Sequence, residues 1–411
     1  ADPQALNMKQ KSIEYVPEQP LAYLSDAGLA TAGVAAGIKA SGRPDVALMV
    51  APRAVPVAAL FTQNAFAAAP VLRCREHLAK TGGLARAIVI NSGNANACTG
   101  AQGEADALAM CRLTAELVGC AVEEVLCAST GVIGVPLPFE RLAQGIRRAH
   151  AELAVSREAS LRCLAAIQTT DAFEKQAGAS FTHGGRTLNV AGIAKGAGMI
   201  EPNMATMLSF VAFDGKVAPA ELGQAIRRIA AGSFNAVHVD SHTSTNDSFF
   251  LLATGSEEGS AGWEQHVAQV SERLAWLIAR DGEGATKVTR IEVRGAESDA
   301  IANEIARTIA KSALVRTALF GNDPNWGRFV SAAGNSSHVR VASEVSCVLL
   351  GTTVFERGEP TTFDKAALSR ALSQTDDVRL ELRVGQGPGS ATVLTSDLGY
   401  RYVEINAEYT T

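Results

Sequence analysis

The sequence lacks the features that direct proteins to membranes or nucleic acids. No apolar run approaches the roughly 18 residues of a membrane-spanning helix, and residues 1–7 have neither the basic start nor the apolar stretch of a secretion signal. Basic runs interleaved with aromatic residues are missing too, and the net charge is only −5. We therefore expect a cytoplasmic protein that acts on small molecules, with no nucleic-acid partner and no membrane partner.

The sequence also lacks cysteine patterns for disulfides or metals. Seven cysteines are present, an odd number, and none forms a Cys-x-x-Cys pair. Their apolar neighbours predict reduced, buried side chains that pack as small hydrophobic groups. They are Cys74, Cys98, Cys111, Cys120, Cys127, Cys163 and Cys347. With neither a Cys-His ligand cluster nor a Walker-type phosphate loop, no metal and no organic cofactor are expected.

What is present is a globular composition. Apolar residues make up 47% of the 411 residues and charged residues 19%, which suits two or three domains. Short apolar strands alternate with amphipathic helices, and this predicts an α/β or α+β architecture. Strands are predicted at residues 87–90, 207–210 and 291–293, β-rich structure at 378–403, and helices at 104–118, 219–229, 263–277 and 301–305.

Residues 192–210, GIAKGAGMIEPNMATMLSF, form an unusual stretch. Gly196, Gly198 and Pro202 rule out a regular helix and allow backbone angles that other residues avoid. The stretch would thus deliver Thr206 in a tight loop to the start of an apolar strand. A hydroxyl beside a strained peptide bond can attack the preceding carbonyl, move the acyl group from nitrogen to oxygen and give way to water. By themselves, these residues are more typical of an ordinary glycine-rich turn.

The same stretch closely resembles the self-cleavage signature of the ornithine acetyltransferase (glutamate N-acetyltransferase) family. Six further blocks resemble this family in the same order, and with them the resemblance extends from about Gly33 to the last residue. The blocks are NSGNANA (91–97), STGVIG (129–134), QTTD (168–171), TSTND (243–247), GNDPNWGR (321–328) and YVEINAEYTT (402–411). Because the blocks cover nearly the whole chain, the sequence is identified as a member of this family.

The resemblance implies a two-domain ornithine acetyltransferase-type fold with a four-layered αββα core. It implies cleavage between Ala205 and Thr206 into an α fragment, residues 1–205, and a β fragment, residues 206–411. The β fragment would complete the core and carry the second domain, and two such pairs would assemble as α2β2. The implied reaction moves acetyl from N-acetylornithine to glutamate through an acetyl-threonine, in arginine biosynthesis.

The resemblance also assigns roles to residues. Thr206 would be the self-cleavage residue and then the acetyl carrier, with its own freed α-amine as general base. Thr130 and Gly131 match the positions of an oxyanion hole, which uses a hydroxyl and a backbone N–H. Lys195 would face a carboxylate, and Glu283 the δ-amine of ornithine. The matched substrate-binding positions are Thr169, Lys195, Thr206, Glu283, Asn406 and Thr411.

Several points stay open in the sequence. Thr169 is the expected substrate contact, and its neighbour Thr170 is the alternative. The family commonly has Gly-Asp where this chain has Ser241-His242, and we expect an ordinary loop histidine there. Acetyl-CoA as a second donor stays open, because family members with and without that activity share these site residues. The alternatives to the acetyltransferase are an amidohydrolase or aminopeptidase that uses the same threonine, and an uncleaved binding protein.

Overall fold

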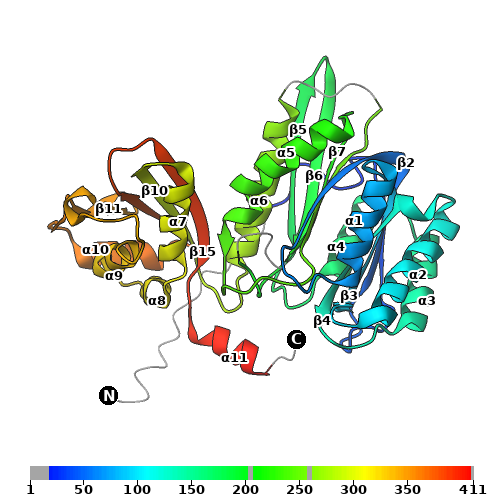
Figure 1. The fold of residues 1–411 in the computed structure, drawn as a ribbon, viewed down its shortest axis with the longest axis horizontal. Coiled ribbons are helices and arrows are strands. Elements are labelled where there is room, and N and C mark those ends of the chain that lie inside the picture. The colour runs from blue at the N-terminus through cyan, green and yellow to red at the C-terminus, as the bar shows by residue number, and fades with distance from the viewer. Residues whose placement is uncertain (1–17, 202–206, 257–261, 409–411) are drawn as a thin grey trace. The chain divides into compact units, whose positions relative to one another are not determined.

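The chain divides into two compact units (Figure 1). The computed structural model describes residues 18–201, 207–256 and 262–408. Unit 1 comprises Ala1–Glu18 and Gly284–Val403, and unit 2 comprises Gln19–Glu283 and Glu404–Thr411. The expected cleavage position falls inside unit 2, so both fragments would contribute strands and helices to this unit.

Unit 2 is built on an eight-stranded mixed sheet. Its main path runs β4-β3-β2-β9-β7-β6-β5, and β1 pairs with β2 beside this path. The strands are β1 (Ala30–Val34), β2 (Val46–Phe61), β3 (Leu84–Asn94), β4 (Val125–Val132), β5 (Lys175–His183), β6 (Arg186–Lys195), β7 (Leu208–Phe213) and β9 (Ser248–Ala253), and the short β8 spans Val237–His238. The long strand β2 joins two halves of the sheet, because residues 46–50, 55 and 56 pair with β1 or β3 and residues 57–61 pair with β9.

Helices cover both halves of this sheet. Helices α1 to α4 pack on strands β1 to β4, and α5 and α6 pack on β2, β5 and β6. They are α1 (Ala69–Thr81), α2 (Gly100–Val118), α3 (Phe139–Ala151), α4 (Arg157–Ile167), α5 (Pro219–Gly232) and α6 (Trp263–Arg280), with 3-10 turns at Val122–Glu124 and Phe234–Ala236. Leu48 and Val89 from the first half lie in the same hydrophobic cluster as Phe210 and Phe250 from the second. The two halves therefore share one core.

The predicted helices form where their sequence signals lie. Helix α2 ends at Gly119, whose φ of +74° is left-handed, as expected for a glycine C-cap. Helix α5 begins with Pro219 in its first turn and buries a stripe of Leu222, Ile226 and Ile229. The indole of Trp263 at the start of α6 is buried and stacks on Phe213. These helix predictions are confirmed.

Unit 1 contains a mixed sheet with strand order β13-β12-β11-β14-β10-β15. Strand β10 runs parallel to β14 and antiparallel to β15, and helix α7 packs on β10 and β15. The elements are β10 (Val288–Ala296), α7 (Asp299–Ala310), α8 (Ala313–Phe320), α9 (Trp326–Ala333), a 3-10 turn (Ala342–Glu344), β11 (Ser346–Leu349), β12 (Thr352–Glu356), β13 (Glu359–Pro360), α10 (Lys365–Ser373), β14 (Asp377–Arg383) and β15 (Gly389–Ser396). Ile291, Ile305 and Leu380 lie in its own hydrophobic cluster.

The α/β prediction is confirmed by these two mixed sheets. The β-rich prediction for residues 378–403 is right for β14 and β15 but wrong at its end, because Tyr400–Glu408 forms helix α11. The expectation of buried cysteines holds for five of the seven. Cys98 is exposed and Cys120 is half-buried, and all seven are free thiols.

Candidate active site

Lys195 and Thr130 meet at the ends of two strands. Lys195 is the last residue of β6, and Thr130 lies near the end of β4. Lys195 Nζ donates a hydrogen bond of 3.1 Å to Thr130 Oγ1, and only 4% and 5% of the two residues is exposed. Because an ammonium can only donate, the threonine hydroxyl accepts here and keeps its own hydrogen for another acceptor. Thr130 is therefore able to donate to an oxyanion.

Gly131 follows Thr130 and lies against strand β3. Its φ is +135°, and a Cβ atom at this position would lie 2.3 Å from the carbonyl carbon of Gly93. The parallel pairing of β3 and β4 shifts register beside Gly93 and Asn94, which brings the two backbones close together. Only glycine fits this approach, and this explains the residue type at the expected oxyanion position.

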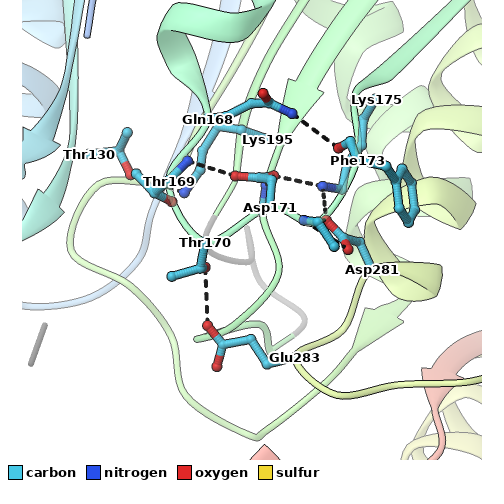
Figure 2. Close-up of polar contacts among 12 residues, drawn as sticks. Thr130, Gln168, Thr169, Thr170, Asp171, Phe173, Lys175, Lys195, Asp281 and Glu283 are labelled. Carbon is cyan, nitrogen blue, oxygen red and sulfur yellow. Dashed lines mark hydrogen bonds and ion pairs between the residues drawn. The ribbon is translucent and has the colours of Figure 1, made fainter. Parts of the chain in front are cut away.

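A buried charge cluster holds the neighbouring loop (Figure 2). Lys175, the first residue of β5, has no exposed surface and donates to Asp171 at 2.6 Å and also to Asp281. Asp171 accepts two further hydrogen bonds, from the backbone amides of Thr169 and Gly196, both at 2.8 Å. Asp171 therefore ties the loop that follows α4 to the end of strand β6.

Burial and neighbouring charges shift the pKa values of these groups in opposite directions. Burial raises the pKa of Asp281 to about 6, against the charge of Lys175. Burial would also raise the pKa of Asp171, but the charges of Lys175 and Lys195 and the hydrogen bonds hold it well below its usual range. Burial lowers the pKa of Lys195, and the charge of Asp171 partly offsets this. Asp171 therefore stays ionised as the pH falls below 6, where Asp281 takes up a proton, and its charge balances Lys195.

A second polar group gathers around Glu283. Its carboxylate accepts from Thr170 Oγ1 at 3.1 Å and from Asn406 Nδ2 at 2.8 Å, and Figure 2 shows Thr170 and Glu283 facing each other. Its backbone N–H donates to the carbonyl of Ala197 at 2.9 Å. A Cβ atom at Gly198 would lie 2.6 Å from the Glu283 carboxylate, so this glycine permits the approach. A carboxylate has about four acceptor positions, so these two bonds leave capacity for a ligand ammonium.

Thr169 and Thr170 make different contacts. The N–H of Thr169 donates to Asp171, and its carbonyl accepts from Arg43 Nη2 at 3.0 Å. The hydroxyl of Thr170 is the one that contacts Glu283. The substrate-binding role of Thr169 stays a prediction.

The expected site residues thus fall into two groups within the part of the chain that the structure describes. Thr130, Gly131 and Lys195 form one group, and Glu283 and Asn406 meet in the other. Three expected residues lie outside the described ranges: Ala205, Thr206 and Thr411.

Three carboxylates beside these groups were not predicted as site residues. Asp171 and Asp247 end the QTTD and TSTND motifs, and Asp240 precedes the second of them. Asp171 binds the Gly196 amide across 25 residues, and Asp247 binds the Met207 amide across 40. Burial raises the pKa of Asp247 well above its usual range, against the Met207 hydrogen bond and the charge of Lys195. The motifs were a signal for these residues, but partners at such separations follow only from the sheet order.

Asparagine side chains of neighbouring loops bind strand β4 next to Thr130. Asn246 Nδ2 donates to the carbonyls of Ala95 at 2.6 Å and Ser129 at 2.9 Å. The hydroxyl of Ser129 donates to Asn91 Oδ1 at 2.6 Å. Three of the motifs that carry the family resemblance therefore meet next to Thr130, where they position the strand end.

The departure at Ser241-His242 has a structural reading. Ser241 adopts a φ of +63°, in the left-handed region that favours the glycine common in the family. His242 is exposed, and its N–H donates to Asp240 Oδ1 at 3.3 Å. His242 thus lies in an exposed loop, as expected, and its effect on the site stays a prediction.

Five of the other histidines pack against neighbouring groups or lie near the surface. His77 is buried against the carbonyl of Val125, His266 stacks on Phe181, and His150, His183 and His338 are half-buried or exposed. The described ranges contain no group of three or more His, Cys, Asp or Glu residues that could hold a metal ion. In those same ranges no helix is long and apolar enough to cross a membrane.

The fold and these groups define an α/β enzyme with a buried polar site that suits small charged molecules. The chain belongs to the ArgJ family, whose model matches residues 30–411. A similar protein from Rhodopirellula baltica, named Arginine biosynthesis bifunctional protein ArgJ, is 43% identical, with 93% of this chain and 96% of its own covered. The family prediction is confirmed.

Two solved structures are also similar to this chain. The arginine biosynthesis bifunctional protein from Bacillus halodurans is 36% identical, with a TM-score of 0.42 over 45% of this chain and 95% of its own. The ornithine acetyltransferase from Mycobacterium tuberculosis, complexed with ornithine, is 38% identical, with a TM-score of 0.40 over 44% of this chain and 93% of its own.

Proposed function

We propose that the chain is a self-cleaving glutamate N-acetyltransferase of arginine biosynthesis that works in the cytoplasm. It cleaves itself before Thr206 and then moves acetyl from N-acetylornithine to glutamate. The products are ornithine and N-acetylglutamate. Family membership and the names of the relatives support the pathway, and the geometry around Thr130 supports the chemistry.

The observation that carries the proposal is the bond from Lys195 Nζ to Thr130 Oγ1. Acyl transfer passes through a tetrahedral intermediate with negative charge on oxygen, which needs donors already in place. Because the Thr130 oxygen accepts the hydrogen bond from Lys195, its O–H is left to donate to the oxyanion. The N–H of Gly131 would supply the second donor, next to a glycine that the packing requires.

The reaction would proceed in two halves. The Thr206 hydroxyl attacks the acetyl carbonyl, its proton passes to its own α-amine, and ornithine leaves with that proton on its nitrogen. The amine of glutamate then attacks the acetyl-threonine ester and releases the Thr206 hydroxyl. Lys195 would offer its charge to a substrate carboxylate. Glu283, already oriented by Thr170 and Asn406, would accept the δ-ammonium of ornithine.

The two fragments would stay together after cleavage. Strand β6 of the α fragment pairs with β7 of the β fragment, from Val190 opposite Phe213 to Lys195 opposite Leu208. Strand β2 of the α fragment pairs with β9 of the β fragment. Separation would expose these strand edges and the shared core, so we expect one αβ unit, assembled further as α2β2.

The test is acetyl transfer by the purified, cleaved protein. We expect N-acetylglutamate to form from N-acetylornithine and glutamate, and Glu283→Gln to raise KM for N-acetylornithine more than it lowers kcat. Release of acetate at the same rate without glutamate would instead identify an amidohydrolase. Acetyl-CoA in place of N-acetylornithine should be a poor donor, and comparable rates with the two donors would make the chain bifunctional, as the names of its relatives state of them.

A further inference from the structure

Two carboxylates of one loop bind the backbone on both sides of residues 202–206. The loop joins β8 to β9 and carries Asp240 and Asp247. Asp240 binds the chain before residue 202, and Asp247 binds the chain after residue 206. The Ala205–Thr206 bond of the proposed function therefore lies between two anchored points.

Besides the hydrogen bond from His242 in its own loop, Asp240 accepts two backbone hydrogen bonds from the segment before residue 202. Met199 donates to its Oδ2 at 2.6 Å and Ile200 to its Oδ1 at 2.8 Å. The carbonyl of Ile200 accepts in return from the backbone amides of Val239 and Asp240, at 2.9 and 3.2 Å. Met199 has a φ of +60°, a left-handed conformation that is costly for a long side chain. Both oxygens of Asp240 are thus used to hold a strained backbone.

Asp247 binds the other side with a single oxygen. The N–H of Met207 donates to its Oδ1 at 3.2 Å, and the N–H of Ser248 donates to the carbonyl of Met207 at 3.0 Å. Only 1% of Asp247 and of Met207 is exposed. The second oxygen, Oδ2, is buried without a hydrogen-bond partner in the described residues.

The loop that carries both carboxylates is itself held rigidly. The carbonyls of Thr243 and Ser244 accept from the side chains of Asn64 and Thr62, at 2.8 and 2.6 Å. Asn246 binds the backbone next to Thr130. A loop fixed at these points can hold the backbone at Met199–Ile200 and at Met207 in constant positions.

We propose that Asp240 and Asp247 are positioning residues for self-cleavage, and that Asp247 alone keeps this role in acetyl transfer. This rests on the proposed function. After cleavage, Asp240 of the β fragment holds Met199 and Ile200 of the α fragment, which are not among the residues proposed to contact substrate. Asp247 holds the amide directly after the nucleophile, within the same fragment. Loss of Asp240 therefore affects only the cleavage, and loss of Asp247 affects both reactions.

The experiment compares alanine and asparagine variants of the two residues. Cleavage is followed by denaturing electrophoresis and mass spectrometry from freshly translated chain. We expect Asp240→Ala and Asp247→Ala to cleave at least about tenfold more slowly than the wild type. The reason is that the Thr206 hydroxyl and the Ala205 carbonyl would no longer be held in position to react. Asp240→Asn should stay slow, since its one acceptor oxygen serves only one of two amides. Asp247→Asn should cleave nearly as fast as the wild type, since it keeps the acceptor for Met207.

Asp214→Ala is the matched control. Asp214 follows the opposite end of β7 and accepts from the backbone amide of Asn189 at 2.7 Å. The substitution removes a carboxylate that binds a backbone amide of the neighbouring strand β6, at the opposite end of the β6–β7 pair. The cleavage rate of this variant should stay within about threefold of the wild type. A slowdown equal to that of the Asp240 and Asp247 variants would show a general loss of stability and overturn the proposal.

Acetyl transfer is then measured on fully cleaved chains. We expect kcat close to wild type for Asp240→Ala and a loss of about tenfold for Asp247→Ala, with KM little changed. Wild-type cleavage rates in both alanine variants would overturn this inference alone, and a wild type that never cleaves would overturn the proposed function. Slow cleavage by Asp247→Asn would also overturn this inference, because the role of Asp247 would then be proton transfer and not positioning.

Discussion

Substitution of Thr130 by alanine tests the oxyanion assignment directly. The Thr130 hydroxyl is 3.1 Å from Lys195 Nζ in a site where only 5% of the threonine is exposed. Loss of one donor from an oxyanion hole costs about 10²–10³ in kcat, or about 2.7–4 kcal/mol. We expect Thr130→Ala to lower kcat for acetyl transfer by this factor and to change KM much less, since the donor is used mainly in the transition state.

The control for this prediction is Thr130→Ser. Serine keeps the hydroxyl and removes one methyl group, which is worth about 1 kcal/mol of buried surface. It should therefore retain kcat within about tenfold. The assay is steady-state transfer from N-acetylornithine to glutamate, on protein shown by electrophoresis to be fully cleaved. A kcat within threefold of the wild type in Thr130→Ala would refute the role of Thr130, and an equal loss in both variants would assign the effect to packing.

Three further predictions concern the framework of the site. Lys175→Met leaves Asp171 and Asp281 buried without their shared cation, so urea unfolding should show a loss of about 3–5 kcal/mol, and a loss below about 1 kcal/mol would contradict the cluster. Because burial raises the pKa of Asp281 to about 6, the folded state holds a proton that the unfolded state releases near pH 4. The stability that Asp281 contributes is therefore present at low pH and falls by up to about 3 kcal/mol as the pH rises from 4 to 6. The substitution Asp281→Asn should remove this part of the pH dependence of Tm. Gly131→Ala places a Cβ atom 2.3 Å from Gly93 and should cost at least about 2 kcal/mol, measured as a lowered Tm, whereas an unchanged Tm would show that β3 and β4 are further apart.

Local patterns predicted the elements that have strong local causes. The apolar run before Asn91 became β3, and the stripe from Trp263 to Leu277 became α6, because the burial of these residues follows their own periodicity. The C-terminal segment was different. Tyr400 and the residues after it mix aromatic, charged and apolar side chains without a clear period, and the helix there was not predicted.

The sequence predicted which residues belong to the site but not how they are arranged in space. The family resemblance indicated Lys195, Thr130 and Glu283, but their partners depend on which strands are neighbours. Lys195 meets Thr130 across 65 residues, and Thr170 meets Glu283 across 113. No local pattern encodes such pairings. For the same reason, the role of Asp171 as a link between loop and strand became visible only in the structure.

Self-cleavage is the central claim, and the mass of the purified protein tests it most directly. Purified wild-type chain and the Thr206→Ala variant are incubated separately, each beside a denatured reference sample. Their products are then identified by intact mass spectrometry and N-terminal sequencing. The wild type should give two fragments, residues 1–205 and 206–411, with the second beginning Thr-Met-Leu. Thr206→Ala should remain a single chain of 42.8 kDa. A wild type that stays intact after long incubation, or an alanine variant that still splits at this bond, would contradict the account.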